Sequence, residues 1–461
     1  RMGRTSERMT ALRREAAALE FGHMQALFAP YLRLPEGFGA TERNRLYSHG
    51  RVFWTFLAQV LAADGGCAAA VQAFLAWING VEGKEASPNT GAYCKARKGL
   101  PLEEVRALHA PLAEAVDAPS PRFWGRRVLV VDGSSLSMPD TPANQDAWPQ
   151  PKGQKAGCGF PVMRIVGLFS LGTGIWRALS FGALATAERT LFRRAWDHFA
   201  PGDIALADTG FTSYADYVLI ERRGVDAVML NHQCRKKGLR ETRKLGRGDR
   251  LVEWSKGERR PNWLAPEQWH DLPDTFVVRE ITVHVDIPGF RSRTLVIVTT
   301  LRDPMAYPAV EIAALYRRRW AIELYFRDIK ISMGADVLRC KTPDMAQKEL
   351  WMHVIAYNLI RALMLDAARQ HGAPLDRISF KGTCDAARNW APPIAQADGK
   401  RREALIDAMM RAIARNRVPH RPDRTEPRAR KRRPKNYQLL TQPRRLFKET
   451  PHRGKHRGNH A

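Results

Sequence analysis

Between residues 122 and 232, short apolar runs alternate with segments whose apolar residues recur at helical spacing. Short apolar runs bounded by turn residues are typical of strands, and longer amphipathic segments are typical of helices. The pattern predicts three strands, a helix, a strand, a second helix and a last strand, at residues 128–131, 162–169, 174–181, 187–199, 203–207, 213–221 and 225–230. This order predicts an α/β fold with a mixed sheet.

The regions on either side of this centre have helical patterns. Near the N-terminus, two apolar helices precede a segment rich in Lys and Arg, and small basic helical domains commonly contact DNA. The alternative is a plain helical cap on a larger domain. The predicted helices cover residues 51–61 and 68–78 before the centre, and 308–331, 345–370 and 401–415 after it.

The stretch from 233 to 305 interrupts the α/β pattern. It begins with a dense run of cations, continues through Trp254 and Trp263, and ends in two β-rich runs at 276–285 and 294–300. Cations hold a nucleic-acid backbone and aromatic rings stack on bases, so this stretch is a candidate DNA contact. The alternative is a solvated loop with ordinary core tryptophans.

These changes of pattern predict five segments. They are a helical N-terminal segment at 1–118 that is a candidate DNA-binding domain, an α/β segment at 122–232, a β-rich insertion at 233–305, a helical segment at 306–372, and a helical and basic C-terminal region at 373–461.

Charge narrows the class of partner. The 461 residues include 74 Lys and Arg against 47 Asp and Glu, a net charge of +27, which favours a polyanion such as nucleic acid. Residues 415–461 hold 16 of the cations and 3 of the acids, so about half of the surplus belongs to the rest of the chain. An anionic membrane surface is the weaker alternative, since we find no apolar run long enough to span a bilayer.

Two aspartates follow apolar runs at the predicted sheet. Asp132 comes after 128–131, and Asp208 comes after 203–207. In open α/β sheets, sites are built at strand ends, and two carboxylates on neighbouring strands can share a divalent ion. Mg²⁺ fits because it prefers oxygen ligands and retains waters. Each Asp-turn alone is a weak signal.

A stripe of polar residues follows on the predicted helix at 308–331. With 3.6 residues per turn, Tyr316, Arg319, Glu323 and Lys330 fall within about 60° of one another around the axis. The stripe could be a solvated face. However, apolar residues occupy much of the remaining circumference, which is typical of a buried helix, so the stripe is a candidate lining of a site.

These residues resemble a known family. The spacing Tyr316-x2-Arg319-x3-Glu323-x6-Lys330 is similar to the Y-R-E-K signature of bacterial insertion-sequence DDE transposases, specifically the insertion-sequence-4 family. The segment VVDGSSLSMPDTPAN and the segment from Gly202 to Tyr214 resemble the family's two strand-Asp elements. The resemblance covers nearly the whole chain and is weakest at its ends.

The resemblance implies an RNase H-like catalytic core, with its first part at 122–232 and its second part at 306–372, and with the β-rich insertion between the fifth strand and the acid-bearing helix. It implies that Asp132, Asp208 and Glu323 are catalytic and hold two Mg²⁺ ions, with Mn²⁺ as the alternative ion. It implies that the other three residues of the signature contact the phosphates of the transposon end. It also implies a hairpin route, in which a tryptophan of the insertion holds an unstacked base; Trp254 and Trp263 are the candidates.

The implied function is a DNA transposase that acts on double-stranded DNA at terminal inverted repeats and joins the element to target DNA, as a homodimer in the synaptic complex. The implied location is the bacterial cytoplasm, on the nucleoid, with no membrane partner. The alternative is a catalytically inactive DNA-binding relative that regulates or inhibits transposition. An inactive relative would have lost a catalytic acid or residues of the polar stripe, and all of those residues are present in this chain.

Overall fold

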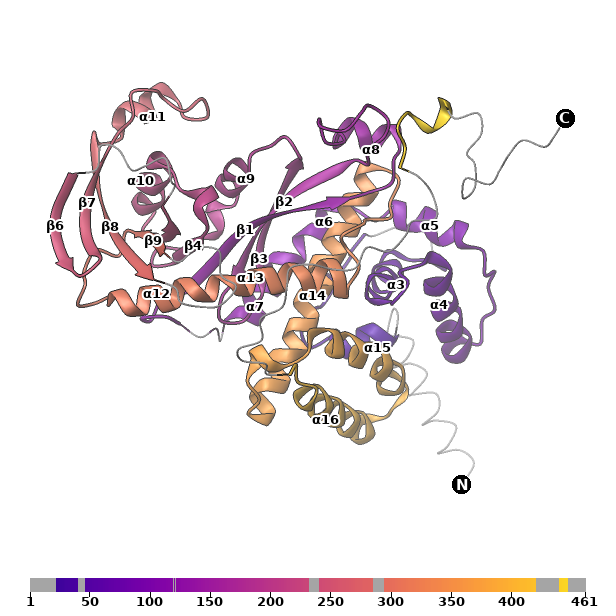
Figure 1. The fold of residues 1–461 in the computed structure, drawn as a ribbon. Coiled ribbons are helices and arrows are strands. Elements are labelled where there is room, and N and C mark those ends of the chain that lie inside the picture. Colours follow the sequence, from indigo (N-terminus) through magenta and orange to yellow (C-terminus); the bar gives the residue numbers. More distant parts are fainter. Residues whose placement is uncertain are drawn as a thin grey trace, which may run out of the picture.

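The computed structural model of this chain describes residues 22–39, 46–118, 120, 122–231, 240–284, 294–419 and 439–446. One long sheet forms the centre, and the N- and C-terminal helices gather beside one another at one end of the molecule (Figure 1). No helix in the described ranges is long and apolar enough to cross a membrane.

Nine strands form the sheet, in the order β3-β2-β1-β4-β5-β9-β8-β7-β6. β1, β4 and β5 run parallel to one another, and every other neighbouring pair is antiparallel. The strands are β1 (Val128–Ser137), β2 (Val162–Ser170), β3 (Trp176–Ala183), β4 (Ile204–Ala207), β5 (Asp226–Leu230), β6 (Arg240–Gly246), β7 (Asp249–Ser255), β8 (Thr275–His284) and β9 (Thr294–Thr299). The prediction of an α/β fold with a mixed sheet is confirmed.

Helices cover both faces of this sheet. Successive side chains of a strand point to opposite faces, so Val130 joins the hydrophobic core on one side of β1 while Leu129 and Val131 join the core on the other side. One face is covered by α9 (Glu188–Arg194) and α10 (Tyr214–Arg222), and the other by the helices that follow β9. Burial on both faces explains why these strands are continuous apolar runs in the sequence.

The cation-rich stretch contains a hairpin that the sequence pattern does not predict. β6 and β7 pair antiparallel, and β7 pairs with β8, so this hairpin continues the central sheet. Arg240, Arg243 and Lys244 are exposed on β6, the edge strand, where charged side chains discourage pairing with another molecule. Those charges hide the strand pattern. The first cations of the stretch, at 235–237, lie outside the described residues.

The remaining helices share a core with the sheet. α14 is the longest, with Pro343 in its first turn and left-handed Gly372 ending it, and most of its side chains are buried. Together with α9 and α10, the α-helices are α2 (Gly22–Phe28), α3 (His49–Leu61), α4 (Cys67–Glu82), α5 (Thr90–Lys98), α6 (Leu102–Ala107), α7 (His109–Asp117), α8 (Pro142–Ala147), α11 (Pro266–Asp271), α12 (Ala309–Arg317), α13 (Ala321–Arg327), α14 (Pro343–His371), α15 (Phe380–Gln396) and α16 (Gly399–Arg415).

α14 connects the two ends of the chain. It packs against α3, α6 and α7 from the N-terminal region and against α15 and α16 from the C-terminal region. All of these helices belong to one continuous hydrophobic core together with one face of the sheet. The division into five segments stays a prediction.

Candidate active site

The first two candidate acids lie on neighbouring parallel strands. β1 and β4 pair in register up to Val130 and Leu206, and Asp132 and Asp208 each lie two residues further along. This register places the two carboxylates at the same level of the sheet. The sequence prediction is correct that Asp208 follows its strand directly. It is wrong for β1, which continues through Asp132 to Ser137 because β2 pairs with it along that whole length.

Both carboxylates are partly fixed by their own turns. Asp132 Oδ1 accepts a hydrogen bond from the Gly133 amide at 2.8 Å, and Asp208 Oδ1 accepts one from the Gly210 amide at 2.8 Å. Burial, and after it the negative charge of Asp208, raise the pKa of Asp132 to about 6. The positive charge of Arg319 lowers the pKa of Asp132. A half-buried carboxylate whose pKa is raised in part by a neighbouring carboxylate is typical of a site that takes up a cation.

The segment that carries the polar stripe is not one regular helix, contrary to the prediction for 308–331. α12 ends at Arg317, a 3-10 turn, η4 (Arg318–Trp320), follows, and α13 leads into a π-helical turn, η5 (Asp328–Ser332). π-helical turns occur frequently at functional sites. The angles calculated for a regular helix therefore do not apply to this segment. Two of the polar residues nevertheless reach β1.

Arg319 and Lys330 are the residues that reach β1. Arg319 Nη1 lies 3.7 Å from Asp132 Oδ2, and the Arg319 side chain is 11% exposed. Lys330 Nζ donates to Ser134 Oγ at 3.3 Å. The structure thus brings two cations of the stripe to the strand that carries the first acid.

Tyr316 lies directly beneath Arg319. Its ring centroid is 5.8 Å from the Arg319 guanidinium carbon, and burial raises the pKa of its hydroxyl to about 12. Neither the Tyr316 hydroxyl nor Arg319 Nε has a hydrogen-bond partner among the described residues. Buried donors without a partner cost stability, so these two groups are candidates for binding a ligand oxygen.

Glu323 is placed apart from the two aspartates. It is exposed on α13. Within the described ranges, no group of three or more His, Cys, Asp or Glu side chains lies close enough together to hold a metal ion. The structure therefore brings Asp132 and Asp208 together with Arg319, and does not bring the third predicted acid to them.

The two candidate tryptophans have different environments. Trp254 is a correction to the sequence analysis: it is 1% exposed on β7 and packs against Tyr217 in the core, so it presents no free ring to a base. Alternate residues of a half-buried strand face the core, which explains why Trp254 is buried. Trp263 is 39% exposed, and the guanidinium carbon of Arg193 lies 3.6 Å from its ring centroid. Trp263 stays a candidate.

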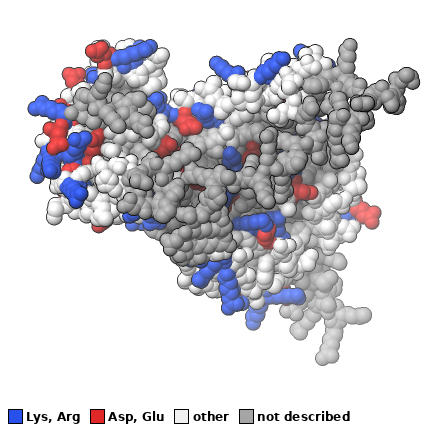
Figure 2. All heavy atoms as spheres, viewed as in Figure 1, with Lys and Arg blue, Asp and Glu red and all other residues white. Residues whose placement is uncertain are grey.

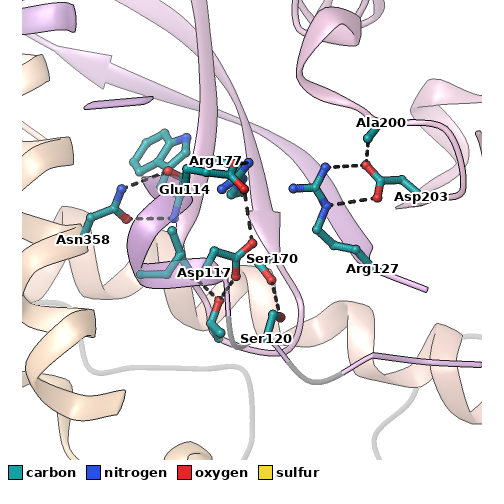
Figure 3. Close-up of polar contacts among 12 residues, drawn as sticks. Glu114, Asp117, Ser120, Arg127, Ser170, Arg177, Ala200, Asp203 and Asn358 are labelled. Atoms are coloured by element: carbon teal, nitrogen blue, oxygen red, sulfur yellow. Dashed lines mark hydrogen bonds and ion pairs between the residues drawn. The ribbon is translucent and has the colours of Figure 1, made fainter. Parts of the chain in front are cut away.

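Asp203 shows how a nearby acid differs from the candidates. It precedes β4, where its carboxylate pairs with Arg127 at 3.0 and 2.6 Å and accepts from the Ala200 amide at 2.8 Å (Figure 3). The Asp203 amide also donates to the Ala200 carbonyl at 3.0 Å, so Asp203 closes a turn before β4. Figure 3 also shows Asp117, at the end of α7, and Arg177, at the start of β3, near this pair. Arg127 and Asp203 precede β1 and β4, so these polar contacts lie at the opposite end of the parallel strands from Asp132 and Asp208.

Positive side chains are spread widely. Figure 2 shows Lys and Arg among acidic residues at the end of the molecule that carries β6 and β7, and again over the helices at the lower end. Lys400, Arg401 and Arg411 are exposed on α16. Such a distribution suits contact with an extended polyanion.

The sequence analysis missed one acid of this region, Glu188. It is the first residue of α9, and its negative charge is among the causes of the raised pKa of Asp132. The predicted helix at 187–199 already placed an acid in its first turn. However, an acid there is common because it favours the helix dipole, so the pattern gave no reason to choose it.

Comparison with known proteins identifies the class. Residues 123–359, slightly more than half of the chain, match the family described as transposase DDE domain. This stretch contains both aspartates and the whole segment from Tyr316 to Lys330, and the chain belongs to the DDE transposases.

Among individual proteins, the chain is 28% identical over 355 residues to the transposase InsG for insertion sequence element IS4 of Escherichia coli (strain K12), covering 75% of this chain and 77% of that protein. The predicted resemblance to DDE transposases of this type is confirmed. The cryo-EM structure of the piggyBac transposase synaptic complex with hairpin DNA is similar at 9% identity with a TM-score of 0.40, covering 88% of this chain and 87% of that chain.

Proposed function

We propose that this transposase cuts its transposon out at the terminal inverted repeats by metal-dependent hydrolysis and transesterification through a DNA hairpin, and inserts it into target DNA. The observation that carries the proposal is the parallel register of β1 and β4, which sets Asp132 and Asp208 side by side with Arg319 next to them. We also propose that the core is RNase H-like. The order of three antiparallel strands followed by parallel β4 and β5 supports this.

The donors at this site suit a divalent cation. Asp132 and Asp208 offer hard carboxylate oxygens, and their mutual repulsion would be relieved by positive charge between them. Glu323 stands apart from them in this structure, and we propose it as the third ligand because the spacing of its segment is similar to the family's signature. When bound, Mg²⁺ or Mn²⁺ ions, two in the proposed site, would activate the attacking oxygen and stabilise the leaving 3′-oxygen.

The neighbouring polar side chains would position the DNA. Arg319 and Lys330 supply positive charge and N–H donors, which a scissile phosphate needs, and the Tyr316 hydroxyl supplies a further donor. The unpartnered donors of Tyr316 and Arg319 support this role. In the hairpin step, the exposed ring of Trp263 would stack on a base that has left the helix.

The proposed partners are the two inverted repeats of the element, target DNA and a second copy of this chain in the synaptic complex. The proposed location is the bacterial cytoplasm, on the nucleoid. An inactive regulatory relative is the less favoured alternative, because Asp132, Asp208, Glu323 and the phosphate-contact residues are all retained.

Substitution of one acid tests the proposal. Asp208→Asn removes a negative charge from the cation site and keeps the shape of the side chain. We expect normal binding to a labelled DNA fragment that carries the element's own inverted repeat, and no cleavage with Mg²⁺ on a denaturing gel. Asp197→Asn is the matched control, because Asp197 is 88% exposed and pairs with Arg223 on the surface. Cleavage by Asp208→Asn at the control's rate would refute the assignment.

A further inference from the structure

Ser134 lies on the same face of β1 as Asp132. Side chains alternate along a strand, so residues two apart share one face. Val130 and Leu136, the next residues on this face, belong to the hydrophobic core that also contains Ile329 of the π-helical turn η5, and α13 packs against β1. This face of β1 is therefore covered by the segment that carries the polar stripe.

Two cations of that segment reach two residues of this face. Arg319 Nη1 lies 3.7 Å from Asp132 Oδ2, and Lys330 Nζ donates to Ser134 Oγ at 3.3 Å. Residues two apart on a strand are roughly 7 Å apart, so the two cations are held at successive positions along β1. Among the described residues, Ser134 is the one hydrogen-bond partner of the Lys330 ammonium, and both side chains are half-buried.

The backbone that follows Lys330 is tied to the end of β1. The Asp336 amide donates to the Lys330 carbonyl at 3.3 Å. The Ser137 amide donates to the Asp336 carbonyl at 3.0 Å, and the Leu338 amide donates to the Ser137 carbonyl at 2.8 Å. These bonds hold η5 beside the last residues of β1, and they keep the Lys330 side chain within reach of Ser134.

We infer that Ser134 is a positioning residue, which orients Lys330 for its contact with a phosphate of the transposon end. This inference rests on the proposed function, in which Lys330 makes that contact. A lysine has a long flexible stem, and ordering such a side chain on a ligand costs conformational entropy. The Ser134 hydroxyl accepts one of the three N–H donors of Lys330 before DNA arrives and leaves two donors for phosphate oxygens. Ser134 therefore reduces the entropy that Lys330 loses when DNA binds.

Binding of the full chain to a labelled DNA fragment tests this role, with the element's own inverted repeat and flank in the fragment and EDTA present to prevent cleavage. We expect Ser134→Ala to weaken binding about fivefold, as is typical for the loss of one hydrogen bond. Ser134→Thr keeps the hydroxyl and should bind as the unmodified chain does.

Ser135→Ala is the matched control on the same strand. Ser135 lies on the opposite face of β1, where it pairs with Arg164 of β2, so its loss should leave binding unchanged. Equal affinity of Ser134→Ala and Ser135→Ala would overturn the inference, as would a loss in Ser134→Thr as large as in Ser134→Ala. Thermal melts of each variant check that all of them are folded.

A double-mutant cycle with Lys330 distinguishes positioning from a merely structural role. Lys330→Met should weaken binding more than Ser134→Ala does, and should reduce the slope of log affinity against log salt by about 1. In a chain that already carries Lys330→Met, the added Ser134→Ala should have no further effect. Equal losses from Ser134→Ala in both backgrounds would overturn the inference and leave the proposed phosphate contact intact. Unchanged affinity and salt slope in Lys330→Met would overturn both.

Discussion

Arg279 offers a quantitative test of how the segment from α12 to η5 is supported. It is 0% exposed on β8, where its Nε and Nη2 donate to the two carboxylate oxygens of Asp249 at 2.8 and 2.6 Å. Its Nη1 donates to the carbonyls of Leu301 and Tyr307 at 3.2 and 2.7 Å. Leu301 and Tyr307 lie on the loop that leads into α12. Arg279 therefore connects β7 and β8 to the segment that carries Tyr316 and Arg319.

Arg279→Met keeps much of the volume and removes every donor. Asp249, which is 7% exposed, would then hold a buried carboxylate without its partner, and two loop carbonyls would lose a donor. Removing one member of a buried ion pair costs about 3–5 kcal/mol. We therefore expect the free energy of unfolding to fall by about that amount, measured by urea titration of far-ultraviolet circular dichroism at unchanged slope.

The matched control is a surface pair. Arg222 and Asp271 pair with side chains that are 43% and 72% exposed, so Arg222→Met should cost no more than about 1 kcal/mol. A loss in Arg279→Met that does not exceed the loss in the control would refute the reasoning that burial makes this pair important. A large loss in both variants would refute it equally.

Three further predictions follow from the site, from one buried histidine and from charge. Arg319→Ala should weaken binding to the transposon end and hairpin formation more than the first nick, and equal loss of all steps on a denaturing gel would indicate a purely structural role. Burial lowers the pKa of His109 to about 4, and its Nε2 lies 2.7 Å from the Trp176 carbonyl. A pKa lowered on folding means that stability is complete above about pH 6.5 and is lost as the pH falls toward 4, by about 2 kcal/mol at about pH 5 for this group. His109→Gln should therefore shrink the difference in unfolding free energy between pH 7 and pH 5 by about that amount. An unchanged difference would contradict the lowered pKa of His109 as its cause. Replacing the Lys and Arg residues of 415–461 by Gln should weaken binding to all DNA sequences alike and reduce its salt dependence in filter binding, whereas a loss confined to the inverted repeat would mean that the tail reads bases.

The parallel core was predictable because its strands are buried on both faces. Apolar runs such as 203–207 have few other interpretations, and Asp208 at the end of one is visible in the sequence. The extension of β1 past Asp132 was not predictable, since its residues 133–135 are Gly and Ser and only the pairing with β2 makes them a strand. The same holds for β6, whose exposed cations conceal its extended backbone.

The sequence predicts most of the residues of the candidate site, but it does not predict how they are arranged. The spacing of Tyr316, Arg319 and Lys330 identifies the segment, but a regular helical period cannot show that the segment contains a 3-10 turn and a π-helical turn. The burial of Trp254 depends on packing against Tyr217, which is distant in sequence. Glu188 packs against Gly133 of β1, and such tertiary contacts have no local signal in the sequence.

We have proposed that the paired aspartates make this chain a metal-dependent nuclease and strand transferase. The most direct measurement incubates the full chain with a labelled DNA fragment that carries its own element's inverted repeat and flank, with Mg²⁺ or with EDTA, and resolves the products on denaturing gels. We expect a nick at the transposon end, followed by a hairpin, in the samples with Mg²⁺, and neither product in the samples with EDTA. Binding to the end without any cut in Mg²⁺, or cleavage that persists in EDTA, would contradict this proposal.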